Sequence, residues 1–163
     1  MASAGPKCVA FIDMDCFYVA VERARDASLR GVPCAVVQSN PYERGGVRTV
    51  GADEDRRTAS NGSIIAVSYE ARARGVTRQM RANEARRQCP ELVTVQVPTG
   101  FGKADLRIYK DAGDRVVELL GRRADACEKR SVDEVAIDLT SAARRVLDAD
   151  ADARPPSGAR AFE

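Results

Sequence analysis

The sequence predicts a protein of the α/β class, because two kinds of apolar pattern alternate along it. Short apolar runs rich in β-forming residues indicate strands, and longer segments with apolar residues at helical spacing indicate helices. The predicted strands are residues 8–12, 34–38, 63–68, 92–97 and 135–140, with residues 126–130 as a hairpin partner of the last. At 163 residues and 44% apolar content, the chain is long enough for one domain or two small lobes.

Helices are predicted between these strands, at residues 16–29, 69–74, 81–88, 101–122 and 141–147. Two segments lack such periodicity. Residues 39–62 are rich in glycine, serine, threonine and charge, which predicts an exposed, mobile insertion with few tertiary contacts. Residues 148–163 turn to alanine, acids, proline and glycine, which predicts a flexible tail.

Composition excludes several kinds of protein. The 26 basic and 24 acidic residues give a net charge of +2, which alone does not indicate a nucleic-acid partner. Five cysteines without a Cys-x-x-Cys pair, and no histidine, argue against structural zinc, a disulfide scaffold or a histidine base. No signal peptide is visible in this sequence, and no apolar run in it approaches the roughly 20 residues of a membrane span. We therefore expect an intracellular, soluble protein with reduced cysteines.

Two acids, Asp13 and Asp15, stand where the first strand ends and the first helix begins. Asp15 has two possible roles, as a cap for the free N–H groups of the helix or as part of a metal site. Asp13 follows the apolar run of residues 8–12, which suits a strand buried on both faces. An unpaired buried carboxylate is costly unless a cation or hydrogen bonds compensate it. We therefore expect Asp13 to have partners elsewhere in the chain.

Asp133 and Glu134 are the candidate partners, because the predicted hairpin places them at or beside its turn. An acidic pair in a turn is often only solvated. Together with Asp13, however, it gives three carboxylates from two strands, which is a ligand set that hard divalent cations prefer.

The segment from Glu70 to Arg87 contains six arginines and two acids. One interpretation is a solvated helix face, and the other is an anion-binding lobe. The absence of lysine favours the second, since the guanidinium fork suits phosphate better than a point charge does.

Three motifs carry a resemblance to a known family. Asp13-Met14-Asp15-Cys16-Phe17-Tyr18, Ser131-Val132-Asp133-Glu134 and Asp138-Leu139-Thr140 resemble the catalytic motifs of Y-family translesion DNA polymerases. Residues 34–38 and 64–80 resemble the eta branch of that family in particular. The resemblance covers about residues 8–147, with residues 39–62 as an insertion.

The resemblance implies a palm-type mixed sheet backed by helices, with a small inserted fingers lobe. Residues 1–15 and 100–147 would be an incomplete palm, and residues 16–99 the fingers, followed by the tail. The thumb and little finger would be absent, so we expect this chain alone to be inactive in primer extension. Implied partners are primer-template DNA, deoxynucleoside triphosphates and, through regions outside this chain, a replication clamp. The implied location is the nucleus.

The resemblance also implies the roles of individual residues. Asp13, Asp133 and Glu134, with the Met14 carbonyl, would hold two Mg²⁺ ions, for which Mn²⁺ can substitute. The remaining positions would bind substrate: Cys16, Phe17, Tyr18, Tyr69, Arg72 and Arg78 the nucleotide, and Gln38 and Ile65 the template base or nascent pair. Tyr18 would lie beneath the nucleotide sugar and exclude a 2′-hydroxyl.

Two other functions remain open. One is a palm-type nucleotide cyclase or another two-metal nucleotidyl transferase, which would need neither the arginine-rich lobe nor template contacts. The other is a non-catalytic nucleic-acid-binding fragment. Without the resemblance, Tyr69 would be taken as a packed aromatic, and Arg72 and Arg78 as ordinary surface charges.

Overall fold

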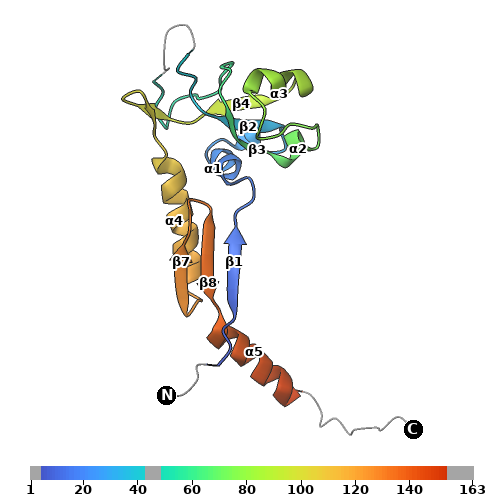
Figure 1. The fold of residues 1–163 in the computed structure, drawn as a ribbon, viewed down its shortest axis with the longest axis vertical. Helices are drawn as coiled ribbons and strands as arrows, with labels where there is room; N and C mark the ends of the chain where they lie inside the picture. Colours follow the sequence, from blue (N-terminus) through green and yellow to red (C-terminus); the bar gives the residue numbers. More distant parts are fainter. Residues whose placement is uncertain (1–4, 43–48, 154–163) are drawn as a thin grey trace, which may run out of the picture. The chain divides into compact units, whose positions relative to one another are not determined.

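The computed structural model describes residues 5–42 and 49–153, and the chain divides into two compact units (Figure 1). The first unit combines Met1–Asp13 with Asp114–Glu163, and the second is Met14–Gly113. The second unit is therefore inserted, in sequence, into the first. Both units combine a sheet with helices, so the α/β class is confirmed. The assignment of palm and fingers to residues 1–15 with 100–147 and to residues 16–99 stays a prediction.

The first unit has an antiparallel three-stranded sheet in the order β1, β8, β7, with bounds Val9–Asp13, Glu134–Asp138 and Ala126–Lys129. Val135 and Ile137 are buried on one face, while Val9 and Phe11 are 59% and 62% exposed on the other. The expectation that residues 8–12 are buried on both faces is therefore wrong. Successive side chains of a strand point to opposite faces, and only one face of this sheet is covered in the described residues.

Helix α4, Arg107–Gly121, packs its second half against the buried face of this sheet (Figure 1). The Cys127 thiol lies 3.8 Å from the Val117 carbonyl, and Lys129 forms an ion pair with Asp114. After β8, helix α5 runs from Thr140 to Ala153. The tail predicted from residue 148 is therefore helical as far as residue 153, and residues 154–163 lie outside the described part.

Helix α4 begins six residues later than predicted. Residues 99–104 instead form a short hairpin, β5 (Thr99–Gly100) and β6 (Lys103–Ala104). Phe101 and Gly102 form its turn, with φ of 50° and 73°, which no helix can contain. The Asp105 carboxylate then accepts a hydrogen bond from the Arg107 N–H at 3.1 Å and caps the helix.

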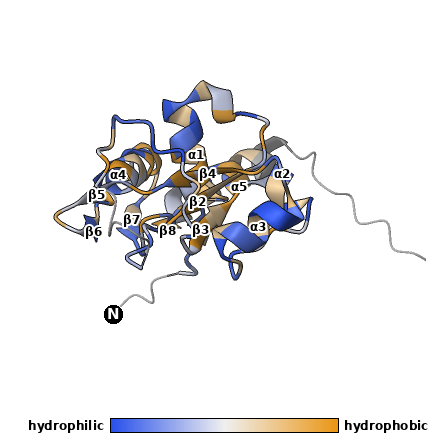
Figure 2. Cartoon of the chain, turned by 90° about the horizontal axis from the view of Figure 1, so that it is seen from above, coloured by the Kyte–Doolittle hydropathy of each residue, from blue (hydrophilic) through white to orange (hydrophobic). Residues whose placement is uncertain are grey.

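The second unit has a mixed sheet in the order β3, β2, β4, with bounds Ile64–Val67, Cys34–Val37 and Val93–Gln96. β2 pairs antiparallel with β3 and parallel with β4. All four β2 residues are buried, as their continuous apolar run predicts. Figure 2 shows these apolar strands beside the hydrophilic outer surface of α3.

Helices cover this sheet. α2 (Tyr69–Arg72) and α3 (Ala82–Gln88) share a core with one face of β2, and α1 (Phe17–Arg25) contacts β2 and β3. The helix predicted over residues 16–29 is shorter, because Asp26 is extended at φ −126°. Its carboxylate accepts the Ser28 N–H at 2.9 Å and starts a separate 3-10 turn, Ala27–Leu29. None of the helices in the described ranges is long and apolar enough to cross a membrane.

The segment of residues 49–61 contradicts the prediction of an exposed insertion with few contacts. Val50 is fully buried and Arg56 is 5% exposed. The Thr58 N–H donates to the Thr94 carbonyl at 2.9 Å, and residues 56–58 run along the outer edge of β4. The charges that suggested a solvated loop are instead paired, which lets part of the segment pack. Residues 43–48 of the predicted insertion lie outside the described residues.

Arg56 is the charge whose removal is expected to cost most stability. It forms a buried ion pair with Glu22, with side chains 4% and 3% exposed, whereas Arg57 pairs with Asp26 at the surface. Arg56→Ala leaves a buried carboxylate uncompensated and should lower the free energy of unfolding by about 3 to 5 kcal/mol. Arg57→Ala, the matched control, should change it little. Urea unfolding measures both, and equal losses would contradict this packing.

Candidate active site

Asp13, the last residue of β1, lies directly opposite Glu134, the first residue of β8. Opposite residues of antiparallel strands present their side chains to the same face. The Glu134 carbonyl accepts hydrogen bonds from the N–H groups of Arg130 and Ser131, at 2.9 and 3.2 Å, and so points away from β1. Asp13 and Glu134 are therefore a non-hydrogen-bonded pair, the type in which side chains approach most closely. Like charges in this position destabilise a sheet.

Asp133 is held by its own turn. The Ser131 hydroxyl donates a hydrogen bond of 2.9 Å to the Asp133 carboxylate, and the Asp133 N–H donates one of 3.3 Å to the Ser131 hydroxyl. Within residues 5–42 and 49–149, no three or more acidic, cysteine or histidine side chains are grouped closely enough to hold a metal ion. Asp13, Asp133 and Glu134 thus do not form such a group in these residues, and their shared role as metal ligands stays a prediction.

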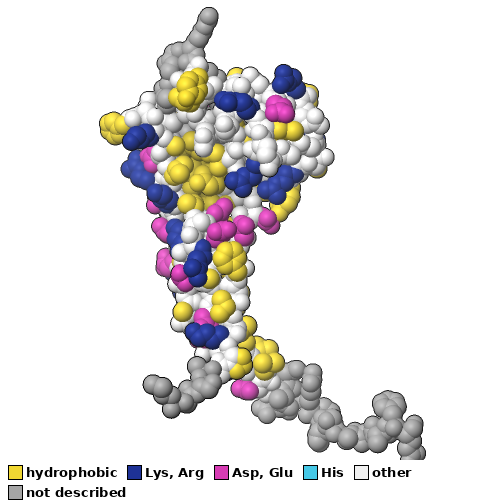
Figure 3. Space-filling model, in the orientation of Figure 1, with side chains coloured by type: hydrophobic (Ala, Val, Ile, Leu, Met, Phe, Trp, Pro, Cys, Tyr) yellow, Lys and Arg dark blue, Asp and Glu magenta, His cyan; other side chains and the backbone are white. Residues whose placement is uncertain are grey.

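The side chain of Asp13 is not buried, contrary to the expectation from its place at the end of an apolar strand. Asp13 is exposed, on the same open face as Phe11, so no burial cost requires it to have a partner. Figure 3 shows acidic and apolar side chains together at the surface of this sheet. The reason to expect a cation is instead that Asp13 lies opposite a second carboxylate, that of Glu134. Carboxylate oxygens are the ligands that Mg²⁺ and Mn²⁺ accept, so this pair fits a divalent ion.

The N-terminus of α1, within the second unit, carries further residues that were predicted to bind the nucleotide. Cys16 precedes the helix with φ 49° and ψ 35°, a left-handed conformation that is uncommon for a residue other than glycine. No side chain caps the helix, so the capping role considered for Asp15 is wrong. The partial positive charge of a helix N-terminus favours anions, phosphates above all. Burial raises the pKa of the Cys16 thiol, against the opposing charge of Arg72.

Tyr69 and Arg72 lie near this helix terminus. Tyr69 is 55% exposed, and its hydroxyl donates to Asp15, a contact that raises the pKa of Tyr69. The Arg72 guanidinium lies 5.2 Å from the centre of the Tyr69 ring, within the range of a cation–π interaction. Two residues predicted to bind the nucleotide thus contact each other and are linked to the strand-to-helix junction through Asp15.

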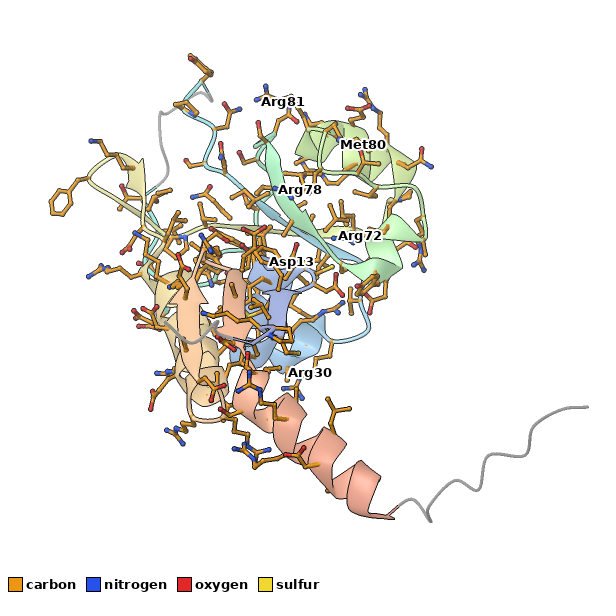
Figure 4. The ribbon with its side chains drawn as sticks, turned by 60° about the horizontal axis from the view of Figure 1, so that its bottom comes forward. Asp13, Arg30, Arg72, Arg78, Met80 and Arg81 are labelled. Carbon is orange, nitrogen blue, oxygen red and sulfur yellow. The ribbon has the colours of Figure 1, made fainter. Side chains whose placement is uncertain are left out.

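Arg78 shares a hollow with Arg72. The hollow has a volume of about 460 Å³ and is lined by the end of β3, by α2 and by the following loop, including Val67 and Thr77. Figure 4 shows Arg72 on α2 and Arg78 in the loop before α3. Two positive charges on one small hollow suit an anionic group such as a phosphate.

Tyr18 and Phe17, in the first turn of α1, have different environments. Phe17 is 6% exposed and belongs to the core. Tyr18 is half-buried, and its ring packs on that of Tyr109, with centroids 4.1 Å apart and planes tilted by 32°. Tyr18 therefore presents only part of its ring to solvent, and the rest is held by packing.

Gln38 and Ile65 lie in the β2–β3 region. Gln38 is exposed just after β2, and its N–H donates to the Ser63 carbonyl at 2.9 Å. Ile65 is half-buried within β3. The backbones approach so closely here that a side chain on Gly62 would meet the Gln38 carbonyl oxygen at 1.9 Å. Both side chains are accessible, and their roles stay predictions.

Three buried polar side chains behind Tyr18 were missed by the sequence analysis. The Tyr109 hydroxyl donates to Glu22, and Glu22 pairs with Arg56. Burial raises the pKa of Tyr109 well above its usual range, and the nearby negative charge of Glu22 is the second largest cause of this rise. Glu22 occupies a polar position of α1 and Arg56 lies in an unpatterned segment, so no periodic signal could have joined them.

Comparison with known proteins identifies the family. Residues 12–154 match the model of the impB/mucB/samB family, and the chain belongs to this family of Y-family polymerases. DNA polymerase eta of Arabidopsis thaliana is 46% identical over 151 residues, which are 93% of this chain and 19% of that protein. DNA polymerase eta of Drosophila melanogaster is 43% identical over 134 residues, 82% of this chain and 13% of that protein. The chain thus spans a fifth or less of these relatives.

Solved structures show the same fold. A Y-family DNA polymerase chimera has a TM-score of 0.62 and 26% identity, with 83% of this chain and 33% of that one covered. An insertion ternary complex of Dbh DNA polymerase has a TM-score of 0.65 and 24% identity, with 88% and 36% covered. The predicted α/β architecture therefore matches that of Y-family polymerases.

The Asp13–Glu134 pair predicts how the chain responds to metal. Glu134→Gln removes one of two opposed charges and should raise stability in EDTA by about 0.2 to 1 kcal/mol. It should also reduce the stabilisation that Mn²⁺ gives to the unaltered chain. Thermal unfolding with and without Mn²⁺ measures both effects. Glu128→Gln, which alters an exposed acid of β7 paired with Arg130, is the control. Equal Mn²⁺ stabilisation of both variants would contradict the assignment.

Proposed function

We propose that this chain carries nucleotide- and metal-binding residues of a translesion DNA polymerase of the eta branch. The reaction is two-metal nucleotidyl transfer, which extends a primer past damaged template bases. The observation that carries the proposal is the direct opposition of Asp13 and Glu134 across β1 and β8. In a chain of this family, such a pair is the arrangement expected of metal ligands at a strand end.

The eta assignment is supported by the degree of similarity. The two relatives named DNA polymerase eta are 46% and 43% identical to this chain. DNA polymerase IV 1 of Bacillus subtilis is 36% identical over 129 residues. The difference favours the eta branch over the bacterial one.

Asp13, Asp133, Glu134 and the Met14 carbonyl would hold the two Mg²⁺ ions, or Mn²⁺ in their place. When bound, such ions activate the attacking hydroxyl and neutralise charge on the leaving group. The residues proposed to contact the triphosphate lie within the second unit. Arg72 and Arg78 offer guanidinium donors on one hollow, and the uncapped start of α1 offers backbone N–H groups.

The partners of this activity are deoxynucleoside triphosphates and primer-template DNA. The arginine-rich stretch from Glu70 to Arg87 supports an anionic partner, and Figure 3 shows Lys and Arg side chains on the surface of the second unit. A nuclear location and a replication clamp as partner stay predictions from the family resemblance.

Primer extension tests the proposed reaction, in the polymerase encoded by the complete reading frame. Asp13→Asn should reduce the rate at least about a thousandfold, because metal coordination supplies several kcal/mol of transition-state stabilisation. Glu118→Gln removes an exposed acid of α4 that pairs with Arg122 and should leave the rate unchanged. Undiminished extension by Asp13→Asn, or formation of a cyclic nucleotide instead, would refute the proposal.

Tyr18 should set the choice of sugar. Tyr18→Ala removes the ring proposed to lie beneath the nucleotide and should raise ribonucleotide insertion relative to deoxyribonucleotide by about 10- to 200-fold, the range that shape discrimination gives. Tyr18→Phe keeps the ring and should preserve discrimination. The measurement is the ratio of kcat/KM for the two nucleotides. An unchanged ratio in Tyr18→Ala would remove Tyr18 from the sugar site.

A further inference from the structure

The ring of Tyr18 is connected to a buried arginine through three successive contacts. Tyr18 packs on Tyr109, with ring centroids 4.1 Å apart. The Tyr109 hydroxyl donates to Glu22 Oε1, and Arg56 Nη1 donates to the same oxygen at 2.7 Å. Arg56 Nη2 donates to Glu22 Oε2, which makes the pair bidentate. A single carboxylate thus fixes both the tyrosine that supports Tyr18 and the arginine.

Burial limits the movement of the side chains that make these contacts. Tyr109 is fully buried, Glu22 is 3% exposed and Arg56 is 5% exposed. Burial, the largest single effect, lowers the pKa of Arg56, but the hydrogen bonds and the charge of Glu22, together with Tyr109, outweigh it and leave the pKa raised. Without the arginine, the Glu22 carboxylate would move towards water, since an uncompensated buried charge is costly. This movement takes the acceptor away from the Tyr109 hydroxyl and releases the Tyr109 ring.

Arg56 is itself held in place by the sheet. Its carbonyl accepts the Gln96 N–H at 2.8 Å, and its Nη1 also donates to the Gln96 carbonyl at 3.0 Å. Its neighbours Arg57 and Thr58 pair with β4 at Val95 and Thr94. The backbone of Arg56 is therefore positioned as firmly as that of an edge strand, although it lies in a segment without strand periodicity.

We propose that Arg56 is a positioning residue for sugar selection, acting through Glu22 and Tyr109 on the ring of Tyr18. The proposal rests on the proposed function, in which Tyr18 excludes the 2′-hydroxyl of a ribonucleotide. A steric filter works only if the excluding group cannot retreat, because an ångström of movement is enough to admit one oxygen atom. Residues 49–61, predicted to be a tolerated insertion, thereby become part of the substrate-selecting structure.

The test measures the ratio of kcat/KM for deoxyribonucleotide and ribonucleotide in the complete polymerase. Arg56→Met should lower this ratio by up to about 100-fold, the effect of a displacement near 1 Å, with a smaller change in kcat/KM for the deoxyribonucleotide. Arg56→Lys keeps the charge and should restore part of the ratio. Arg57→Met, in the same segment but at the surface, should leave the ratio unchanged.

A double variant separates positioning from general stability. In a Tyr18→Ala background there is no ring to hold, so Arg56→Met should not lower the ratio further. A further drop there would show that Arg56 acts by another route and would overturn the proposal. If Arg56→Met does not fold, Tyr109→Phe replaces it, because it removes the hydroxyl that contacts Glu22 and keeps the stacked ring.

The outcomes also separate this proposal from the proposed function. If Tyr18→Ala leaves the ratio unchanged, the sugar role of Tyr18 fails, and with it the basis of the inference. If Tyr18→Ala relaxes selection while Arg56→Met, or Tyr109→Phe in its place, does not, the sugar role stands and the positioning role of Arg56 is refuted.

Discussion

The buried ion pair between Arg56 and Glu22 is the contact on which the second unit most depends. Two charges inside a protein require each other, because each alone carries a desolvation cost of several kcal/mol. This requirement fixes where residues 49–61 lie, since the arginine must reach α1 from the edge of β4. It also fixes the Tyr109 hydroxyl, which uses the same carboxylate. One pair thus joins a helix, a sheet edge and the start of α4.

Most elements of the fold could be predicted because they depend on local patterns. The strand at residues 34–37 is buried on both faces, and its unbroken apolar run indicates this. The run at residues 9–13 has similar composition, yet one face is open, because composition cannot say whether a second layer covers a strand. The hairpin at residues 99–104 had a usable signal in Gly100-Phe101-Gly102, which favours a turn over the predicted helix.

From its strand and helix patterns alone, the sequence predicted only those residues of the candidate site that stand at the end of a strand. Asp13 and Glu134 face each other because each stands at the end of a strand, a position that the sequence reveals. Arg56 could not be found in this way. Its partner is 34 residues away, its segment has no periodicity, and its dense charges resemble those of a solvated loop. Arg56 and Glu22 come together only in the folded chain. This long-range ion pair is what allows the charge of Arg56 to be buried.

The Glu22–Arg56 pair joins opposite charges and the Asp13–Glu134 pair joins like charges, and this difference suggests different roles for them. Glu22 and Arg56 neutralise each other, so their geometry is complete without a ligand and can serve as fixed support. Asp13 and Glu134 carry the same charge and gain no such stability from each other. Their arrangement becomes favourable only when a cation joins them, which makes the acidic pair responsive to ligand. The proposed two-metal reaction would use both kinds of centre, because substrate discrimination requires rigid support and catalysis requires a site that is completed by its ions.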